Sequence, residues 1–310
     1  MAAMNVIEVS GLTKSYGRIH ALRGVDLSVT AGTSFGFLGP NGAGKTTTMR
    51  ILLGLLRATT GAARVLGQDA WHNSTALRAQ IGYLPGDVRF YEWMTGQRLV
   101  DFCNRTRGGG HDREILRLKE RFDLDLSRPI RDYSRGMKQK LGLITAMMHR
   151  PPLLILDEPT TALDPLVRQT LYQELRASVA NGQTVLFSSH TLSEVEEMCD
   201  RVAIIRDGRI IEDNSIARLQ ERALRRVEFR MSNDELQRLR FPADWVPTEN
   251  RNGSVTGTWR GPVNGLLAWL ASIPLQDVTI GAPDLEDLFS TYYGTRESAL
   301  GDGRSEGKKC

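Results

Sequence analysis

A glycine-rich run that ends in a lysine is the part of this sequence best suited to bind phosphate. Residues 39–47 read Gly-Pro-Asn-Gly-Ala-Gly-Lys-Thr-Thr and fit the pattern G-x-x-x-x-G-K-[ST]. In such a loop the backbone N–H groups converge on phosphates, Lys45 reaches the β- and γ-phosphates, and the Thr46 hydroxyl ligates Mg²⁺. The run therefore predicts a site for a nucleoside triphosphate with Mg²⁺. Its contacts are expected from Gly39, Asn41, Gly42, Ala43, Gly44, Lys45, Thr46 and Thr47.

Two adjacent acids, Asp157 and Glu158, follow an apolar run at 153–156. The run is too short for most helices, and its continuous apolar character is typical of a buried parallel strand. At the end of that strand, Asp157 can hold the Mg²⁺ shell and Glu158 can polarise the water that attacks the γ-phosphate. The pair therefore indicates hydrolysis of the bound nucleotide.

A histidine follows another apolar run, at 184–187, after two serines. Ligands of open α/β sheets bind at the carboxyl ends of the strands, so His190 can approach the same γ-phosphate. A lone histidine at such a position is more often structural. Its spacing after the two acids favours the functional interpretation, and we expect His190, Glu158 and Lys45 to be the catalytic residues.

The elements that must position these residues alternate along the chain. An apolar strand at 35–38 precedes the phosphate loop, and an amphipathic helix begins near Lys45. Strands and helices alternate again from Leu153 to about Leu219, as in a doubly wound α/β sheet. Between these parts the pattern is helical, with helices expected over 94–103, 113–122 and 137–148.

A change of pattern near residue 221 predicts a second, smaller α+β domain, with a split βαβ arrangement as one option. Asn233 is expected to cap its first helix. Strands are expected at 226–231, 255–259 and 276–280, and helices at 233–239, 263–270 and 284–292. We therefore divide the chain into a nucleotide-binding domain at 1–220 with a helical subdomain at about 90–150, an accessory domain at 221–298, and a disordered tail at 299–310.

The composition is ordinary for a soluble globular chain of 310 residues, with 41% hydrophobic and 25% charged residues. No apolar run reaches the about 18 residues of a membrane-spanning helix, and residues 1–5 show no secretion signal. The net charge of +4 is small and forms no Lys/Arg-rich stripe, so no nucleic-acid partner is expected. Cys103, Cys199 and Cys310 lack metal-binding spacing and are expected to be free thiols in a reducing cytoplasm.

Residues 133–137, Tyr-Ser-Arg-Gly-Met, open the helix that precedes the acidic strand. Together with the phosphate loop, the two acids and the histidine, they resemble the nucleotide-binding subunit of an ATP-binding cassette (ABC) transporter, a P-loop NTPase. The family signature L-S-G-G-Q is matched at Ser134 and Gly136 only. These are the positions that would present a hydroxyl and a backbone N–H to phosphate at a helix N-terminus.

The resemblance implies further positions at the nucleotide. Tyr16 matches the aromatic residue on which the family stacks adenine, the alternative being a tyrosine packed at a sheet edge, and Asp164 joins the nucleotide contacts. After the strand at 81–84 the family usually has a glutamine that reaches Mg²⁺ and the attacking water. This chain has Gly86, so either Asp87 or water fills the gap, or sensing of the γ-phosphate is weakened.

The pattern is most similar to the drug- and antibiotic-resistance exporter branch of bacterial ABC ATPases. The resemblance implies an ATPase subunit at the cytoplasmic face of the cell membrane that powers export of a drug-like or amphipathic compound through a separate transmembrane permease subunit. It also implies a head-to-tail dimer with a second copy or a paralogous ATPase. In that dimer Ser134 and Gly136 meet the ATP held by Lys45 of the opposite chain.

Three other functions compete with export. An importer ATPase with a regulatory C-terminal domain shares every catalytic residue. A non-transport ABC ATPase acting on DNA or ribosomes would need a long coiled-coil insertion or two tandem cassettes, and the sequence has neither. An interaction protein without catalysis is disfavoured because Lys45, Asp157, Glu158 and His190 are all intact.

The segment at 88–94 places Phe90, Tyr91 and Trp93 directly after the loop at Gly86. Such a cluster is either the core of a helix or an aromatic surface on which the membrane partner docks, because aromatic residues favour the cores of interfaces.

Overall fold

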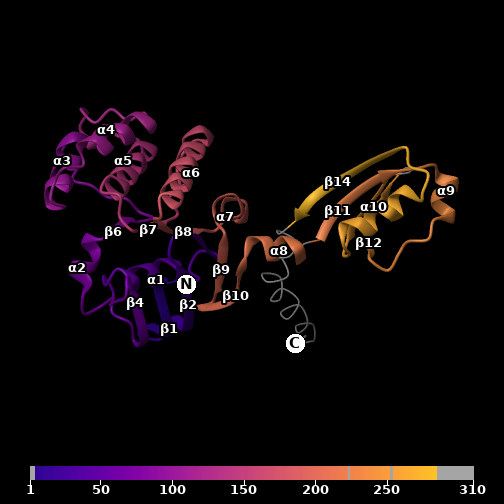
Figure 1. The fold of residues 1–310 in the computed structure, drawn as a ribbon, viewed down its shortest axis with the longest axis horizontal. Helices are drawn as coiled ribbons and strands as arrows, with labels where there is room; N and C mark the ends of the chain where they lie inside the picture. The colour runs from indigo at the N-terminus through magenta and orange to yellow at the C-terminus, as the bar shows by residue number, and fades with distance from the viewer. Residues whose placement is uncertain (1–3, 223, 252–253, 285–310) are drawn as a thin grey trace, which may run out of the picture. The chain divides into compact units, whose positions relative to one another are not determined.

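The computed structural model describes residues 4–222, 224–251 and 254–284. The chain divides into two compact units, residues 1–216 and 217–310. In its described part, the first unit holds two sheets and a group of helices, and the second holds one four-stranded sheet with its helices (Figure 1). The predicted α/β fold is therefore confirmed.

The first sheet of the first unit is antiparallel, with the strand order β2-β1-β4-β5. Val25, Leu27 and Val29 are buried and alternate with exposed residues, as expected for a sheet with one solvated face. The strands are β1 (Asn5–Tyr16), β2 (Ile19–Thr30), β4 (Thr60–Val65) and β5 (Gln68–Asp69).

The second sheet has the order β10-β9-β3-β8-β7-β6 and is parallel except for β10 at its edge. Every residue of the neighbouring strands β3, β8 and β7 is buried, which explains the mainly apolar sequences of these strands. Leu38 pairs with Ser189 and Asp157 pairs with Ser188, so these three strands end side by side. The strands are β3 (Ser34–Leu38), β6 (Ile81–Leu84), β7 (Leu153–Asp157), β8 (Thr184–Ser189), β9 (Arg201–Arg206) and β10 (Arg209–Ser215).

Helix α1 (Lys45–Leu52) follows the phosphate loop and packs between the sheets, touching β2 and β4 of the first and β7 of the second. The predicted helical stretch is present, although α3 starts at Gly96 because the Thr95 side chain caps it by accepting from Arg98 N. None of the helices in the described ranges has the length and hydropathy needed to cross a bilayer. The other helices of this unit are α2 (Ser74–Ala79), α3 (Gly96–Thr106), α4 (Asp112–Arg121), η1 (Ile130–Asp132), α5 (Arg135–Met147), α6 (Pro165–Ala180) and α7 (Leu192–Met198). Helix α8 (Ile216–Arg222) begins at the boundary between the two units.

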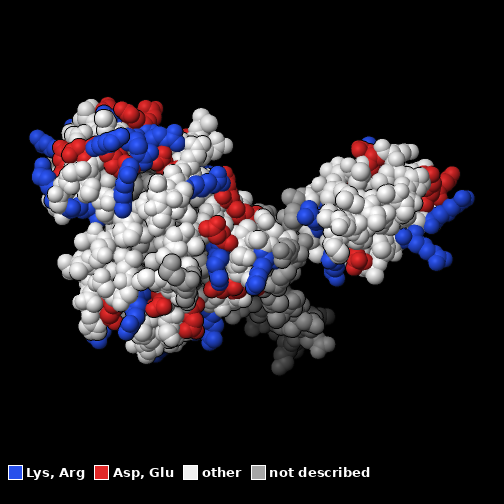
Figure 2. All heavy atoms as spheres, viewed as in Figure 1, with Lys and Arg blue, Asp and Glu red and all other residues white. Residues whose placement is uncertain are grey.

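An ion-pair cluster joins α4 to α6. Arg117 Nη2 lies 2.6 Å from Glu174 Oε2 and 2.7 Å from Glu114 Oε1. Arg121 Nε lies 2.7 Å from Glu174 Oε1, and Arg150 Nη2 lies 2.6 Å from Glu114 Oε2. Burial raises the pKa of Glu174, but its hydrogen bonds with Arg117 and Arg121 outweigh this effect and hold the pKa below its usual value. Figure 2 shows acidic and basic side chains interleaved over the helical part of this unit.

The second unit is a four-stranded antiparallel sheet with the order β12-β13-β11-β14. Its chain order of strand, helix, two strands, helix and strand is the split βαβ arrangement. Phe229, Trp245 and Trp269 pack together in its core, with ring centroids 5.3 to 5.8 Å apart. The elements are β11 (Leu224–Arg230), α9 (Asn233–Arg238), β12 (Trp245–Arg251), β13 (Ser254–Trp259), α10 (Val263–Ala271) and β14 (Asp277–Asp284).

Two details of this unit differ from the sequence prediction. Ser232, not Asn233, caps α9, because Ser232 Oγ accepts from Glu235 N while the Glu235 carboxylate accepts from Ser232 N. Strand β12 was not predicted, since a proline and polar residues break its alternation. The closing helix predicted at 284–292, beyond its first residue, and the tail predicted at 299–310 lie outside the described residues.

Candidate nucleotide site

The loop between β3 and α1 turns its backbone around a small cavity. Gly42 and Gly44 have φ angles of 81° and 115°, in the left-handed region that glycine adopts without steric cost. A Cβ at Gly44 would lie 2.6 Å from Leu22 Cδ2 and 3.0 Å from the Ala21 carbonyl oxygen, so together with the φ of 115° a side chain there would be strained. The cavity, of about 140 Å³, is lined by Ala21, Pro40, Asn41, Gly42, Gly44, Lys45, Thr46, Thr47 and Glu158.

The ammonium group of Lys45 lies across this loop. Its Nζ donates to the Gly39 carbonyl at 2.6 Å and to the Pro40 carbonyl at 3.3 Å, and it lies 3.4 Å from Glu158 Oε1. Lys45 is only 5% exposed, so its charge is directed inward rather than to solvent. Ala43 is also buried, and its N–H donates to the Pro40 carbonyl at 3.2 Å within the turn.

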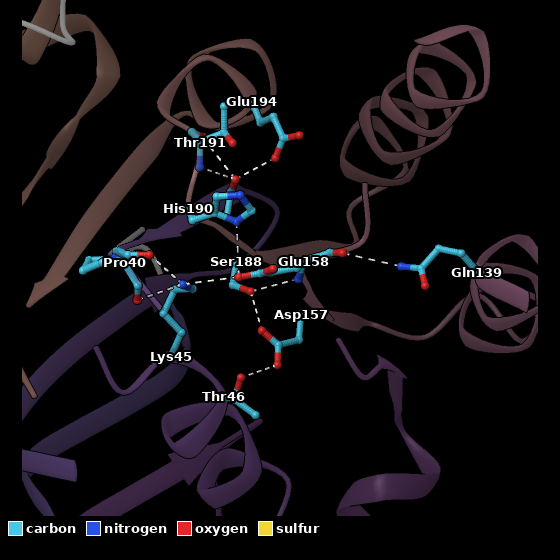
Figure 3. A network of polar contacts seen from close by, with 12 residues as sticks. Pro40, Lys45, Thr46, Gln139, Asp157, Glu158, Ser188, His190, Thr191 and Glu194 are labelled. Atoms are coloured by element: carbon cyan, nitrogen blue, oxygen red, sulfur yellow. Dashed lines mark hydrogen bonds and ion pairs between the residues drawn. The ribbon is translucent and has the colours of Figure 1, made fainter. Parts of the chain in front are cut away.

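Thr46 and Asp157 bring two oxygen groups to one point at the edge of the parallel sheet. Thr46 Oγ1 donates to Asp157 Oδ2 at 2.7 Å, and Ser188 Oγ donates to Asp157 Oδ1 at 2.6 Å (Figure 3). Asp157 is 2% exposed, so its carboxylate is fixed by these contacts. A hydroxyl and a carboxylate are hard oxygen ligands, which Mg²⁺ binds together with water and substrate phosphates. The residues present therefore fit Mg²⁺.

One carboxylate oxygen meets two nitrogen groups at the same edge. Glu158 Oε1 lies 3.4 Å from His190 Nδ1 and 3.4 Å from Lys45 Nζ. The side chains of His190 and Glu158 are 53% and 24% exposed, so both remain accessible. Ser189 Oγ, in the residue before the histidine, donates to Glu194 Oε2 at 2.6 Å and anchors the turn. The structure thus brings together the three residues expected to be catalytic.

Tyr16 ends β1 at the tip of the first hairpin. Its ring is 47% exposed, and Lys14 Nζ lies 5.2 Å from the ring centroid. Ala21, on the return strand β2, lines the phosphate-loop cavity, so this hairpin borders the nucleotide site. The exposed ring is free to stack on a planar group.

Gly86 lies beside the acids. A Cβ built there would be 3.5 Å from Asp157 Oδ2, which is ordinary van der Waals contact. The Asp87 side chain is 74% exposed, and its Oδ2 pairs with Arg89 Nη2 at 2.7 Å. Both Gly86 and Asp87 line a cavity of about 550 Å³ that also touches Asp157 and Glu158, so a larger side chain at position 86 would enter this space.

Three residues predicted to contact the nucleotide, Ser134, Gly136 and Asp164, lie apart from the phosphate loop of their own chain. Ser134 is exposed and caps α5, with Oγ accepting from Met137 N at 3.2 Å. A Cβ at Gly136 would lie 2.7 Å from the Ala162 carbonyl oxygen, so α5 begins against the loop that follows the acids. The Asp164 carboxylate caps α6. None of the three lines the cavity in the phosphate loop or the cavity beside Gly86.

Two polar residues at the site were missed by the sequence analysis. Ser188 bonds to both acids, and its place two residues before His190 is a signal that could have identified it. Gln139 is buried in α5 and donates to the Pro159 carbonyl at 3.0 Å. Nothing in the sequence pattern near Gln139 indicates that contact.

Comparisons with known proteins agree with this geometry. A family model described as ABC transporter matches residues 22–161. The bacitracin transport ATP-binding protein BcrA of Enterococcus faecalis is 36% identical over 234 residues, which cover 74% of this chain and 76% of that protein. The daunorubicin/doxorubicin resistance ATP-binding protein DrrA of Streptomyces peucetius is 34% identical over 305 residues, or 95% of this chain and 88% of that protein. A solved ATP-binding subunit of an ABC transporter is 30% identical, with a TM-score of 0.66, and the match covers 69% of this chain and 92% of that one.

Proposed function

Because this chain belongs to the ABC transporter family as an ATP-hydrolysing subunit, we propose that it powers export of a drug-like or amphipathic compound through a separate transmembrane permease. One observation supports the roles of the site residues above all. A single oxygen of Glu158 lies 3.4 Å from both Lys45 and His190, at the end of the strand that carries Asp157. The export direction is supported by relatives named for bacitracin transport and for resistance to daunorubicin and doxorubicin.

Binding uses the loop and the first hairpin. The backbone N–H groups around Gly42 and Gly44 and the ammonium of Lys45 hold the phosphates, while the exposed ring of Tyr16 stacks on adenine. Thr46 and Asp157 would hold Mg²⁺, which neutralises charge on the phosphate oxygens when bound.

Hydrolysis requires a base near the attacking water. Glu158 takes the proton of that water through a carboxylate oxygen already directed at the phosphate-loop lysine. His190 Nδ1 lies 3.4 Å from the same oxygen and orients it. The lysine charge stabilises the negative charge on the transferred phosphoryl group.

A second chain completes the site in this proposal. Ser134 and Gly136 lie at the start of α5. They line neither the cavity in the phosphate loop nor the cavity beside Gly86, so they are available to the nucleotide of another chain. A head-to-tail pair, formed with a second copy or a paralogous ATPase, places the hydroxyl, the backbone N–H and the helix end on that ATP.

The aromatic segment after Gly86 is the proposed contact with the permease. Tyr91 and Trp93 are 64% and 71% exposed, with ring centroids 6.2 Å apart, whereas Phe90 is half-buried. Exposed aromatic side chains that lie next to each other often mark a site of interaction with another protein. This contact would hold the chain at the cytoplasmic face of the membrane.

The test uses Glu158→Gln and Lys45→Ala. Glu158→Gln should keep ATP affinity and lower turnover roughly 10²–10⁴-fold, the usual contribution of a positioned general base. Lys45→Ala should weaken binding of the nucleotide itself. Unchanged steady-state hydrolysis in purified Glu158→Gln would remove Glu158 from this role.

A second experiment tests transport. It uses membrane vesicles that contain the copurifying permease and a fluorescent amphipathic compound. ATP-dependent movement away from the ATPase side should occur with the wild-type subunit and stop with Glu158→Gln. Movement toward the ATPase side would favour an importer.

A further inference from the structure

Glu158 has an unusual backbone conformation. Its φ is +48°, in the left-handed region, where a residue with a long side chain is uncommon. Such a conformation persists only when surrounding contacts fix it. In this chain, contacts reach the residue from both directions along the backbone.

Ser188 holds the N–H side. Glu158 N donates to Ser188 Oγ at 3.0 Å, and the same hydroxyl donates to Asp157 Oδ1 at 2.6 Å. A hydroxyl has one hydrogen and two lone pairs, so Ser188 can serve both acids at once. Ser188 is fully buried and pairs with Asp157 across β8 and β7, so its position is set by the sheet.

Gln139 holds the carbonyl side. Its Nε2 donates to the Pro159 carbonyl at 3.0 Å and lies 3.5 Å from the Glu158 carbonyl, which also accepts from Thr161 N at 3.2 Å. Gln139 is 4% exposed, so water does not compete for its amide. Figure 3 shows it reaching the loop from α5, on the side opposite Ser188.

We propose that Ser188 and Gln139 are positioning residues that hold the Glu158 backbone from its two sides and thereby direct its carboxylate toward Lys45 and His190. The proposal rests on the proposed role of Glu158 as the base. Because Ser134 caps the helix that carries Gln139, the position of Glu158 is also tied to α5.

Two pairs of matched variants test it. Ser188→Ala removes the hydroxyl at the carboxyl end of β8, and its control, Thr184→Val, removes a buried hydroxyl at the amino end of β8 that accepts from Gly32 N at 2.9 Å. Gln139→Met removes an amide bonded to a proline carbonyl beyond the carboxyl end of β7. Its control, Gln183→Met, removes the same kind of bond, from Gln183 Nε2 to the Pro151 carbonyl, before the amino end of β7.

Ser188→Ala and Gln139→Met should each lower kcat by about 10- to 100-fold, the loss typical of misplacing a catalytic group by an ångström. Affinity for a fluorescent ATP analogue should stay within about 3-fold of wild type, because neither residue contacts the phosphate loop. The two controls should change kcat by less than about 2-fold. Melting temperatures show whether each variant is folded. If Ser188→Ala is not folded, Gln139→Met and its control decide the test.

A double-variant cycle separates positioning from a merely structural role. In the Glu158→Gln background, Gln139→Met should lower the residual single-turnover rate by less than about 2-fold, since the group it positions is already disabled. The same 10-fold loss in both backgrounds, or an unchanged kcat in folded single variants, would overturn the proposal. If Glu158→Gln itself left turnover unchanged, the proposed function would fail first, which keeps the two failures distinct.

Discussion

Replacing Arg117 by methionine should destabilise the first unit by about 1.5–3 kcal/mol. The change removes two charge-assisted hydrogen bonds, to Glu174 and Glu114, whose side chains are only 6% and 12% exposed. Such bonds contribute about 1.5–3 kcal/mol each when shielded. Arg117 itself is 41% exposed, so solvent screening reduces the sum, and each carboxylate keeps one other arginine. The expected loss is therefore about half of the roughly 3–6 kcal/mol that two fully shielded bonds would give, or about 1.5–3 kcal/mol.

Thermal unfolding measures this loss. For a unit of this size, 1 kcal/mol shifts the midpoint by about 2–4 °C, so Arg117→Met should melt roughly 3–12 °C below wild type. Arg113→Met is the matched control, because Arg113 lies on the same helix and has no ion pair within the described part of the chain. Its stability should stay within about 0.5 kcal/mol of wild type.

The pH dependence has a definite sign. The pKa values of Glu114 and Glu174 lie below their usual 4.5, because hydrogen bonds from the arginines outweigh the effect of burial. A lowered folded-state pKa gives stability that is complete above the unfolded value and is lost as pH falls through the folded one. The difference between Arg117→Met and wild type should therefore be full at neutral pH and shrink below about pH 4. An equal difference at low and neutral pH, or an equal loss in Arg113→Met, would refute the reasoning.

Three further predictions concern the site and its partners. Gly86→Gln should raise the ATPase rate if the missing side chain limits it, and an unchanged rate would show that the gap is not limiting. A Ser134→Arg chain mixed with a Lys45→Ala chain should recover one working site per mixed dimer, and an ATP-bound structure with Ser134 far from every nucleotide would contradict sharing. Tyr91→Ala with Trp93→Ala should abolish transport while the isolated subunit still binds ATP, and normal transport by the folded double variant would rule out this contact.

The site could be predicted from sequence where its chemistry is local in the chain. The phosphate loop lies within one continuous run, and Asp157 and His190 each end or follow a buried parallel strand. Parallel strands that lie side by side present their carboxyl ends to one edge, so these residues were expected to meet. The contact of Ser188 with Asp157 depends on which strands are neighbours and on their register, and the contact of Gln139 depends on how α5 packs. Neither is encoded in a short pattern.

The hydrogen bonds of Asp157 decide what a side chain at position 86 can do. Its Oδ2 already accepts from Thr46 and its Oδ1 accepts from Ser188, so the buried carboxylate needs no further donor for stability. A glutamine at Gly86 could donate to the second lone pair of Oδ2, beside the Thr46 hydroxyl, which would leave that oxygen less able to bind Mg²⁺. It could instead extend into the adjoining cavity toward Glu158. Faster hydrolysis by Gly86→Gln with an unchanged Mg²⁺ requirement would indicate that the glutamine extends toward Glu158. Slower hydrolysis with a raised Mg²⁺ requirement would indicate that it donates to Asp157.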